Sequence, residues 1–141
     1  MDEKLKRDII LENYQNPVNR GLTDSDGYIL VNTRNSSCVD NIDVMVKVDN
    51  GIIIDIRFDG EACAISTSAT SIMIKTLIGK NIKEAKNIIE NYENMIEEKE
   101  YDKDLLGELM VYETISKQPS RKKCATLPFE SIKKVISEIE S

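Results

Sequence analysis

The region from residue 42 to residue 58 shows the clearest structural pattern in this chain: Ile42-Asp43-Val44-Met45-Val46-Lys47-Val48-Asp49-Asn50-Gly51-Ile52-Ile53-Ile54-Asp55-Ile56-Arg57-Phe58. Apolar side chains alternate with other side chains before and after Asn50-Gly51. A period of two is typical of half-buried strands, and Asn-Gly between two such runs indicates a tight hairpin turn, because both turn residues need a positive φ. We therefore predict two antiparallel strands with one apolar face. The residues expected on that face are Ile42, Val44, Val46, Val48, Ile52, Ile54, Ile56 and Phe58.

An apolar sheet face needs helices to cover it, and the flanking segments have helical patterns. Helices are predicted over residues 4–15, 66–77, 81–97 and 104–115 and from Pro128 onward, and a short strand over 28–32. Pro119 is expected to break the chain before the last helix. The small polar run over residues 66–71 could let its helix approach a partner or a metal loop closely, but capping hydroxyls at a helix start are the preferred interpretation. The elements predict an α+β fold, in which a small antiparallel sheet of about three strands packs against helices. The chain is expected to form one domain, residues 1–141.

The charge balance limits the classes of partner. The chain has 19 basic and 25 acidic residues, a net charge of −6. This argues against nucleic acid, because binding to phosphates is driven by basic surfaces. No apolar run approaches the roughly 20 residues of a membrane span. The first residues contain no apolar signal-peptide core. We therefore expect a cytoplasmic protein that binds neither nucleic acid nor a membrane.

Three cysteines and the absence of histidine define the chemistry that is open to this chain. Without histidine, it contains no Ser-His-Asp or Cys-His nucleophile system. Three thiols cannot all pair with one another, so free or metal-bound thiols in a reducing compartment are expected. Any four-coordinate zinc or iron site must use sulfur and oxygen ligands. The candidate ligands are Cys38, Asp40, Cys63 and Cys124.

The predicted hairpin brings two of the cysteines together. Cys38 precedes its first strand and Cys63 follows its second, so both emerge at the same end. Asp40 points to the same side as Cys38 if the backbone there is extended. A helix N-terminus after Cys63 favours a thiolate, and the cations of Arg121-Lys122-Lys123 would lower the pKa of Cys124. Local patterning does not bring Cys124 near the others, and each cysteine could instead be a buried apolar residue.

Five segments resemble the motifs of one known family. They are Tyr14-Gln15-Asn16-Pro17-Val18-Asn19-Arg20-Gly21 (Y-x-N-P-x-N-x-G), Cys38-Val39-Asp40 (C-G-D), Gly60-Glu61-Ala62-Cys63 (G-x-G-C), Ser116-Lys117-Gln118-Pro119 (S-K-x-P) and Arg121-Lys122-Lys123-Cys124-Ala125-Thr126-Leu127 (R-x-K-C-A-T-L). In this combination the chain resembles SufU-type members of the IscU/SufU (NifU N-terminal-like) family of iron–sulfur cluster assembly proteins. IscU-type members have a histidine where this chain has Lys123. The resemblance implies a SufE/IscU-like fold.

The resemblance also implies a function and a site. It implies a Zn²⁺ ion bound by Cys38, Asp40, Cys63 and Cys124, or alternatively iron or a [2Fe–2S] cluster. It implies a sulfurtransferase that accepts persulfide sulfur from a PLP-dependent cysteine desulfurase of the SufS type and serves downstream iron–sulfur assembly proteins. Cys38 would be the sulfur acceptor, freed when a histidine of the desulfurase replaces it, and Arg121 would offset the negative charge of the site.

Two positions depart from the family pattern. Val39 and Ala62 stand where the family has glycines. If those glycines serve a positive φ or a close backbone approach, the β-branched Val39 is the costlier change. Two alternatives therefore stay open beside sulfur transfer. One is a scaffold for iron–sulfur clusters, and the other is a diverged relative that keeps only a structural zinc.

Overall fold

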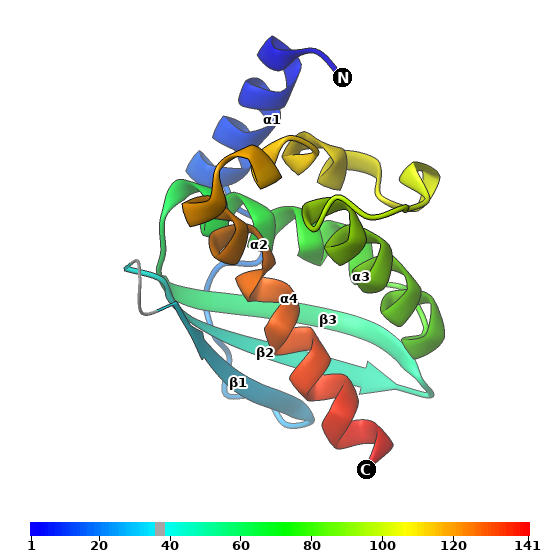
Figure 1. Ribbon diagram of the computed structural model, residues 1–141. Coiled ribbons are helices and arrows are strands. Elements are labelled where there is room, and N and C mark those ends of the chain that lie inside the picture. The colour runs from blue at the N-terminus through cyan, green and yellow to red at the C-terminus, as the bar shows by residue number, and fades with distance from the viewer. Residues whose placement is uncertain (36–38) are drawn as a thin grey trace.

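The structure, a computed structural model, describes residues 1–35 and 39–141, so Cys38 lies outside the described residues. Along the chain the elements are α1 (Glu3–Gln15), β1 (Tyr28–Arg34), β2 (Asn41–Asp49), β3 (Ile52–Glu61), α2 (Ala64–Leu77), α3 (Ile82–Ile96), the short 3-10 helices η1 (Lys103–Leu105), η2 (Gly107–Tyr112) and η3 (Ile115–Lys117), and α4 (Pro119–Glu140) (Figure 1). No helix in this part of the chain is long and apolar enough to cross a membrane.

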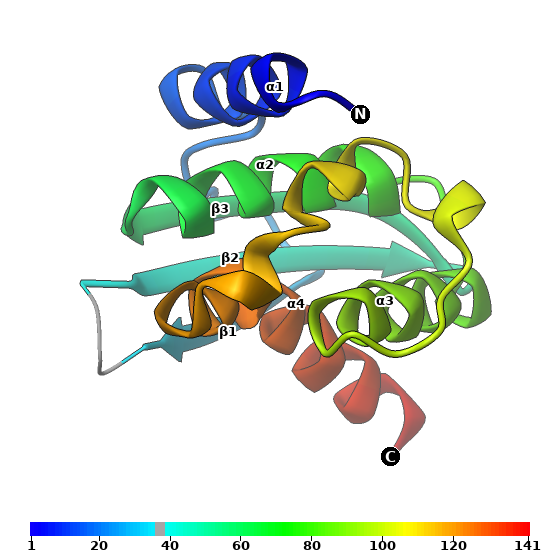
Figure 2. The same ribbon diagram turned by 45° about the horizontal axis from the view of Figure 1, so that its top comes forward.

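The three strands form one antiparallel sheet in the order β1-β2-β3. Helix α4 crosses β1 and β2, and α2 lies along β3 on the same face of the sheet (Figures 1 and 2). Helix α1 packs against α2, and α3 packs beside α4. The prediction of an α+β fold with a small antiparallel sheet under helices is therefore confirmed.

The predicted hairpin is present. Asn50 and Gly51 connect β2 to β3 with φ angles of 52° and 76°, as a tight turn of this type requires. The apolar row of β2 faces the helices, and Val44 is fully buried there. Ile56 and Phe58 of β3 are buried on the same side. Alternation in the sequence therefore predicted the buried face correctly over most of the hairpin.

Near the turn the prediction for β3 is wrong. Lys47 pairs with Asp55, but the next residue, Val48, pairs with Ile53, so Ile54 is an extra residue in β3. Such a β-bulge reverses the alternation of side chains beyond it. Ile53 is consequently buried, with 1% of its surface exposed, whereas Ile54 is 43% exposed.

The C-terminal part also differs from the prediction. The helix expected over 104–115 is a series of 3-10 helices, and α4 begins at Pro119 rather than at Pro128. Pro119 occupies the first turn, where a missing N–H costs nothing. Pro128 lies inside α4, where its missing N–H leaves the Cys124 carbonyl without its usual helical donor. The Ser66 hydroxyl lies 2.8 Å from that carbonyl as a substitute donor, and Cys124 itself lies within the helix rather than before it.

Candidate metal centre

Three of the predicted ligands converge in the structure. One carboxylate oxygen of Asp40 and the sulfur atoms of Cys63 and Cys124 all lie within 4.8 Å of one another. They come from three parts of the fold: Asp40 directly precedes β2, Cys63 lies between β3 and α2, and Cys124 lies in the second turn of α4. Cys63 and Cys124 are free thiols. Cys38, the fourth predicted ligand, falls outside the described residues.

Strand pairing explains why Asp40 meets Cys63. Asn41 at the start of β2 pairs with Glu61 at the end of β3, which places the two flanking residues side by side. The Cys63 amide donates a hydrogen bond of 2.8 Å to Oδ1 of Asp40. The Cys63 sulfur lies 3.9 Å from Oδ2 of the same carboxylate. Both contacts follow from the antiparallel register alone.

Cys63 lies at a helix N-terminus, as predicted, and is the N-cap residue of α2. Its sulfur accepts a hydrogen bond of 3.5 Å from the backbone N–H of Ser66. This N–H belongs to the first turn of α2. Cys63 is half-buried, so its sulfur is accessible from one side.

Cys124 lies in a different environment from the one predicted. It is buried, with 1% of its surface exposed, and Nδ2 of Asn35 lies 3.7 Å from its sulfur. The neighbouring cations do not surround the thiol, because Arg121 is exposed and Lys122 forms an ion pair of 3.6 Å with Glu97. Helical geometry turns these side chains to other faces of α4. The prediction that cations lower the pKa of Cys124 is therefore wrong for the metal-free protein.

Burial instead raises the pKa of the Cys124 thiol well above its ordinary value, and its contacts with Cys63 and Asp40 raise it further. Asp40 behaves in the opposite way. Burial alone would raise its pKa, but the hydrogen bonds that it accepts from the Cys63 amide, the Ser66 hydroxyl and the nearby thiols outweigh burial and lower it. An ionised carboxylate is thus held against two sulfur atoms in a buried place, an arrangement that a cation would stabilise.

The donor set fits zinc. Ligand atoms around one tetrahedral zinc ion lie roughly 3.5–4 Å apart, given metal–ligand distances of about 2.0–2.3 Å. The Asp40–Cys63 separation of 3.9 Å falls in this range. Thiol and carboxylate ligands also suit a chain that contains no histidine. The residues that could hold the ion are Asp40, Cys63 and Cys124, with Cys38 two residues before Asp40.

A hollow of about 460 Å³ opens beside Cys63. It lies between α1, the first turn of α2, the 3-10 helices and the start of α4, and Arg7 and Arg121 contribute to its walls. Arg121 therefore lines the same hollow as Cys63. This position supports the predicted electrostatic role of Arg121, which stays a prediction.

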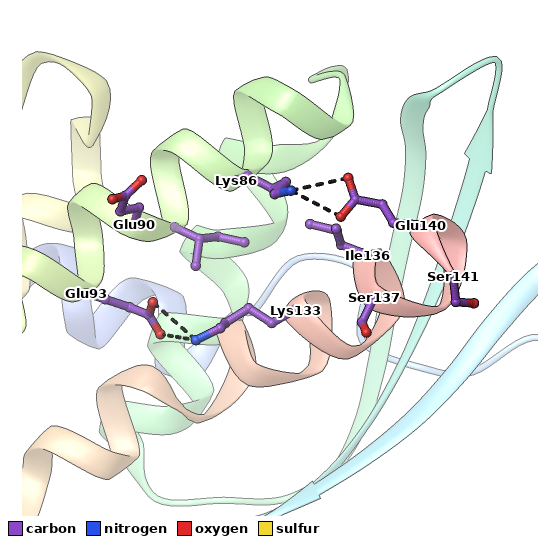
Figure 3. A pocket seen from close by; sticks show the side chains of 9 residues that line it. Lys86, Glu90, Glu93, Lys133, Ile136, Ser137, Glu140 and Ser141 are labelled. Carbon is purple, nitrogen blue, oxygen red and sulfur yellow. Dashed lines mark hydrogen bonds and ion pairs between the residues drawn. The ribbon is translucent and has the colours of Figure 1, made fainter.

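A second hollow, of about 560 Å³, lies between α3 and the C-terminal turns of α4. Figure 3 shows two ion pairs across it, Lys86–Glu140 and Lys133–Glu93, with Ile136 between them. No cysteine stands among the described residues that line it. We assign it no part in the chemistry of the thiols.

Two further residues contact the predicted ligands. The preferred interpretation of the hydroxyl run as helix capping is wrong at Ser66, because Cys63 caps α2 and the Ser66 hydroxyl lies 2.7 Å from Oδ2 of Asp40. The alternative for this run, a close approach of the helix to a metal loop, fits that contact. Asn35, which contacts the Cys124 sulfur, had no signal in the sequence.

Comparison with known proteins agrees with this geometry. The model of the NifU-like N-terminal domain family matches residues 5–125. The chain belongs to this family. The predicted resemblance to the IscU/SufU proteins is thereby confirmed, whereas the assignment of individual metal ligands stays a prediction.

Individual relatives match most of the chain. The zinc-dependent sulfurtransferase SufU of Bacillus subtilis (strain 168) is 36% identical over 140 residues, which are 98% of this chain and 93% of that protein. The scaffold protein IscU of Thermotoga maritima is 31% identical over 120 residues, 85% of this chain and 84% of that protein. A crystal structure from Fervidobacterium islandicum AW-1, described as a candidate scaffold for the SUF system, matches with a TM-score of 0.86 and 28% identity over 94% of this chain and 97% of that one.

Proposed function

We propose that this chain is an iron–sulfur cluster assembly protein that binds zinc and accepts persulfide sulfur from a PLP-dependent cysteine desulfurase of the SufS type. The observation that carries the proposal is the convergence of the Asp40 carboxylate with the thiols of Cys63 and Cys124. Similarity over 98% of the chain to a protein named as a zinc-dependent sulfurtransferase supports the same chemistry. We place this activity in the cytoplasm, where thiols stay reduced.

Cys38 is proposed as the fourth metal ligand, because it lies two residues before Asp40 in the segment that enters β2. A bound zinc ion would hold the cysteine sulfurs as thiolates near neutral pH, where a free thiol is mostly protonated. Three thiolates and one carboxylate around a divalent cation leave a charge of about −2. Arg121, which lines the hollow beside Cys63, is proposed to offset part of that charge.

Cys38 is also proposed as the sulfur acceptor. Its thiolate attacks the terminal sulfur of the persulfide on the desulfurase, so that a new S–S bond forms at Cys38 and the cysteine of the enzyme leaves as a thiolate. Because this chain has no histidine, any imidazole that takes part at the site must come from the partner. Asp40 and Cys124 are buried and stay in place during the exchange.

The similarity to IscU of Thermotoga maritima favours a second candidate function, a scaffold on which a [2Fe–2S] cluster is built. Three thiolates and a carboxylate can hold iron. Anaerobic reconstitution with iron and sulfide tests this candidate. A visible cluster chromophore that disappears in Cys→Ser variants of Cys63 or Cys124 would support the scaffold role.

Zinc content and desulfurase stimulation test the main proposal. We expect the purified chain to contain stoichiometric zinc and to raise the turnover of a SufS-type desulfurase. The variant Cys38→Ala should lose the stimulation, whereas Ser37→Ala, which changes the neighbouring residue but no thiol, should keep it. A Cys38→Ala protein that stimulates as well as the unchanged chain would refute the acceptor role of Cys38.

A further inference from the structure

Ser66 contacts all three described residues of the metal centre. Its backbone N–H donates to the sulfur of Cys63 at 3.5 Å. Its hydroxyl oxygen lies 2.7 Å from Oδ2 of Asp40 and 2.8 Å from the backbone carbonyl oxygen of Cys124. The side chain is completely buried, so water cannot replace these contacts.

Pro128 explains why the Cys124 carbonyl needs this hydroxyl. In an α-helix the carbonyl of residue 124 would accept the N–H of residue 128. Proline has no N–H, and Pro128 lies inside α4, so this bond is missing. An unpaired buried carbonyl is costly, and Ser66 of α2 supplies a donor from outside the helix.

The Ser66 hydroxyl has two acceptors in reach but only one proton to donate. Oδ2, which Ser66 contacts, is also the oxygen at 3.9 Å from the Cys63 sulfur. The hydroxyl therefore contacts the carboxylate oxygen that lies beside the thiol of a second proposed ligand.

We propose that Ser66 is a positioning residue of the metal centre, whose single hydroxyl proton is shared between Oδ2 of Asp40 and the Cys124 carbonyl. The inference rests on the proposed metal site and adds a residue that acts through the ligands rather than on the ion. One contact of the hydroxyl holds Oδ2 beside the Cys63 sulfur. The other contact serves the carbonyl that Pro128 leaves without a helical donor.

Zinc affinity of the full chain, measured by competition with a chelator, tests this role. Outer groups that hold metal ligands typically contribute about 10–100-fold in affinity, and we expect a loss of this size in Ser66→Ala. Ser68→Ala is the matched control. Ser68 is equally buried on the same helix, and its hydroxyl bonds to Tyr112 and the Ile65 carbonyl but to none of the described residues of the centre. Equal zinc affinities of Ser66→Ala and Ser68→Ala would overturn the proposal.

The Pro128→Ala variant distinguishes the contact with Asp40 from the contact with the Cys124 carbonyl. It restores a backbone N–H at residue 128 that can donate to that carbonyl. In the Ser66→Ala background it should recover part of the lost zinc affinity. Strictly additive effects of the two substitutions would contradict the sharing of one proton between Asp40 and Cys124.

If Ser66→Ala does not fold, the pair Ser66→Thr and Ser66→Val replaces it, since these side chains have the same shape and differ in the hydroxyl. The Thr variant should then bind zinc more tightly than the Val variant, and equal binding would overturn the role of Ser66. Zinc binding by the unchanged chain shows whether the metal centre itself or only the role of Ser66 is wrong. If it holds no zinc, the proposed metal centre fails together with this inference, whereas tight zinc binding by both the unchanged chain and Ser66→Ala removes the inference alone.

Discussion

The backbone N–H of Cys63 donates a hydrogen bond of 2.8 Å to Oδ1 of Asp40, and this bond connects the residue before β2 to the N-cap of α2. The pair lies directly beside the paired ends of β2 and β3. Because the helix N-terminus and the carboxylate lie on a fixed frame, two ligands of the proposed centre are preorganised. The third, Cys124, depends on the packing of α4.

Gly60 should be essential to this frame. It has a φ of 132°, and a Cβ atom there would overlap the backbone carbonyl oxygen of Asn41. We expect Gly60→Ala to lower the free energy of unfolding by roughly 3–5 kcal/mol, because strain and a backbone clash act together. Chemical denaturation measures the loss, and zinc affinity should fall with it because the Asp40–Cys63 pair sits at this end of the sheet.

Gly21→Ala is the control for that substitution. Gly21 has a similar φ of 116°, but a Cβ atom there meets nothing within 4 Å. Gly21→Ala should therefore lower the free energy of unfolding only by the cost of backbone strain, about 1–3 kcal/mol. Equal losses at the two glycines would show that the approach of Asn41 is unimportant.

Tyr92→Phe should reduce stability without disturbing the metal ligands. The buried hydroxyl of Tyr92 donates a hydrogen bond of 2.8 Å to the carbonyl of Ala125 in α4. Removing it deletes this buried hydrogen bond, at a cost of about 0.5–1.5 kcal/mol in the free energy of unfolding. Tyr101→Phe, at a 36% exposed position, should change stability little. If Tyr92→Phe lowered zinc affinity but left stability unchanged, the Tyr92 hydroxyl would act on the metal centre rather than on stability.

Zinc binding should release protons and become tighter as the pH rises. Burial raises the pKa of the Cys124 thiol, so this thiol is protonated at neutral pH in the metal-free protein and must lose its proton when a metal binds. Apparent affinity should rise about tenfold per pH unit for each proton released. Chelator competition at several pH values below the thiol pKa gives the slope.

Cys124→Ala is the control for the pH dependence. It removes the group that must lose its proton, so the slope should decrease by the contribution of one proton. An affinity that does not depend on pH in the unchanged chain would contradict the protonated state of Cys124.

Restoring the glycine at position 62 should not improve the protein. Ala62 does not adopt a positive φ, and it packs partly buried against the core. Ala62→Gly should therefore lower the free energy of unfolding by about 0.5–1 kcal/mol and leave desulfurase stimulation unchanged. A strong rise in stimulation would favour the alternative of a diverged relative with only a structural zinc. Val39→Gly, at a 68% exposed position, tests the other departure in the same assay.

The fold was predictable where the signals are local. The Asn50-Gly51 turn and the alternation around it depend on neighbours within a few residues, so the hairpin and its buried face were visible in the sequence. The bulge at Ile54 was not, because an extra residue changes the register without changing the composition of the strand. The predicted start of α4 was wrong for a related reason, because Pro119 and Pro128 both suit the first turn of a helix. In the structure α4 begins at Pro119, and Pro128 lies inside the helix, which packs on β1, β2 and α2.

The same division applies to the metal centre. Residue types alone restricted the site to sulfur and oxygen ligands, and strand pairing alone brought Asp40 beside Cys63. The position of Cys124 in the site depends on tertiary packing. Its carbonyl contacts the hydroxyl of Ser66, which lies 58 residues away in the sequence, and no local pattern in the sequence predicts that contact. Packing between helices brings them together because burial of apolar surface is not directional, and only the folded arrangement shows which polar groups it leaves in contact.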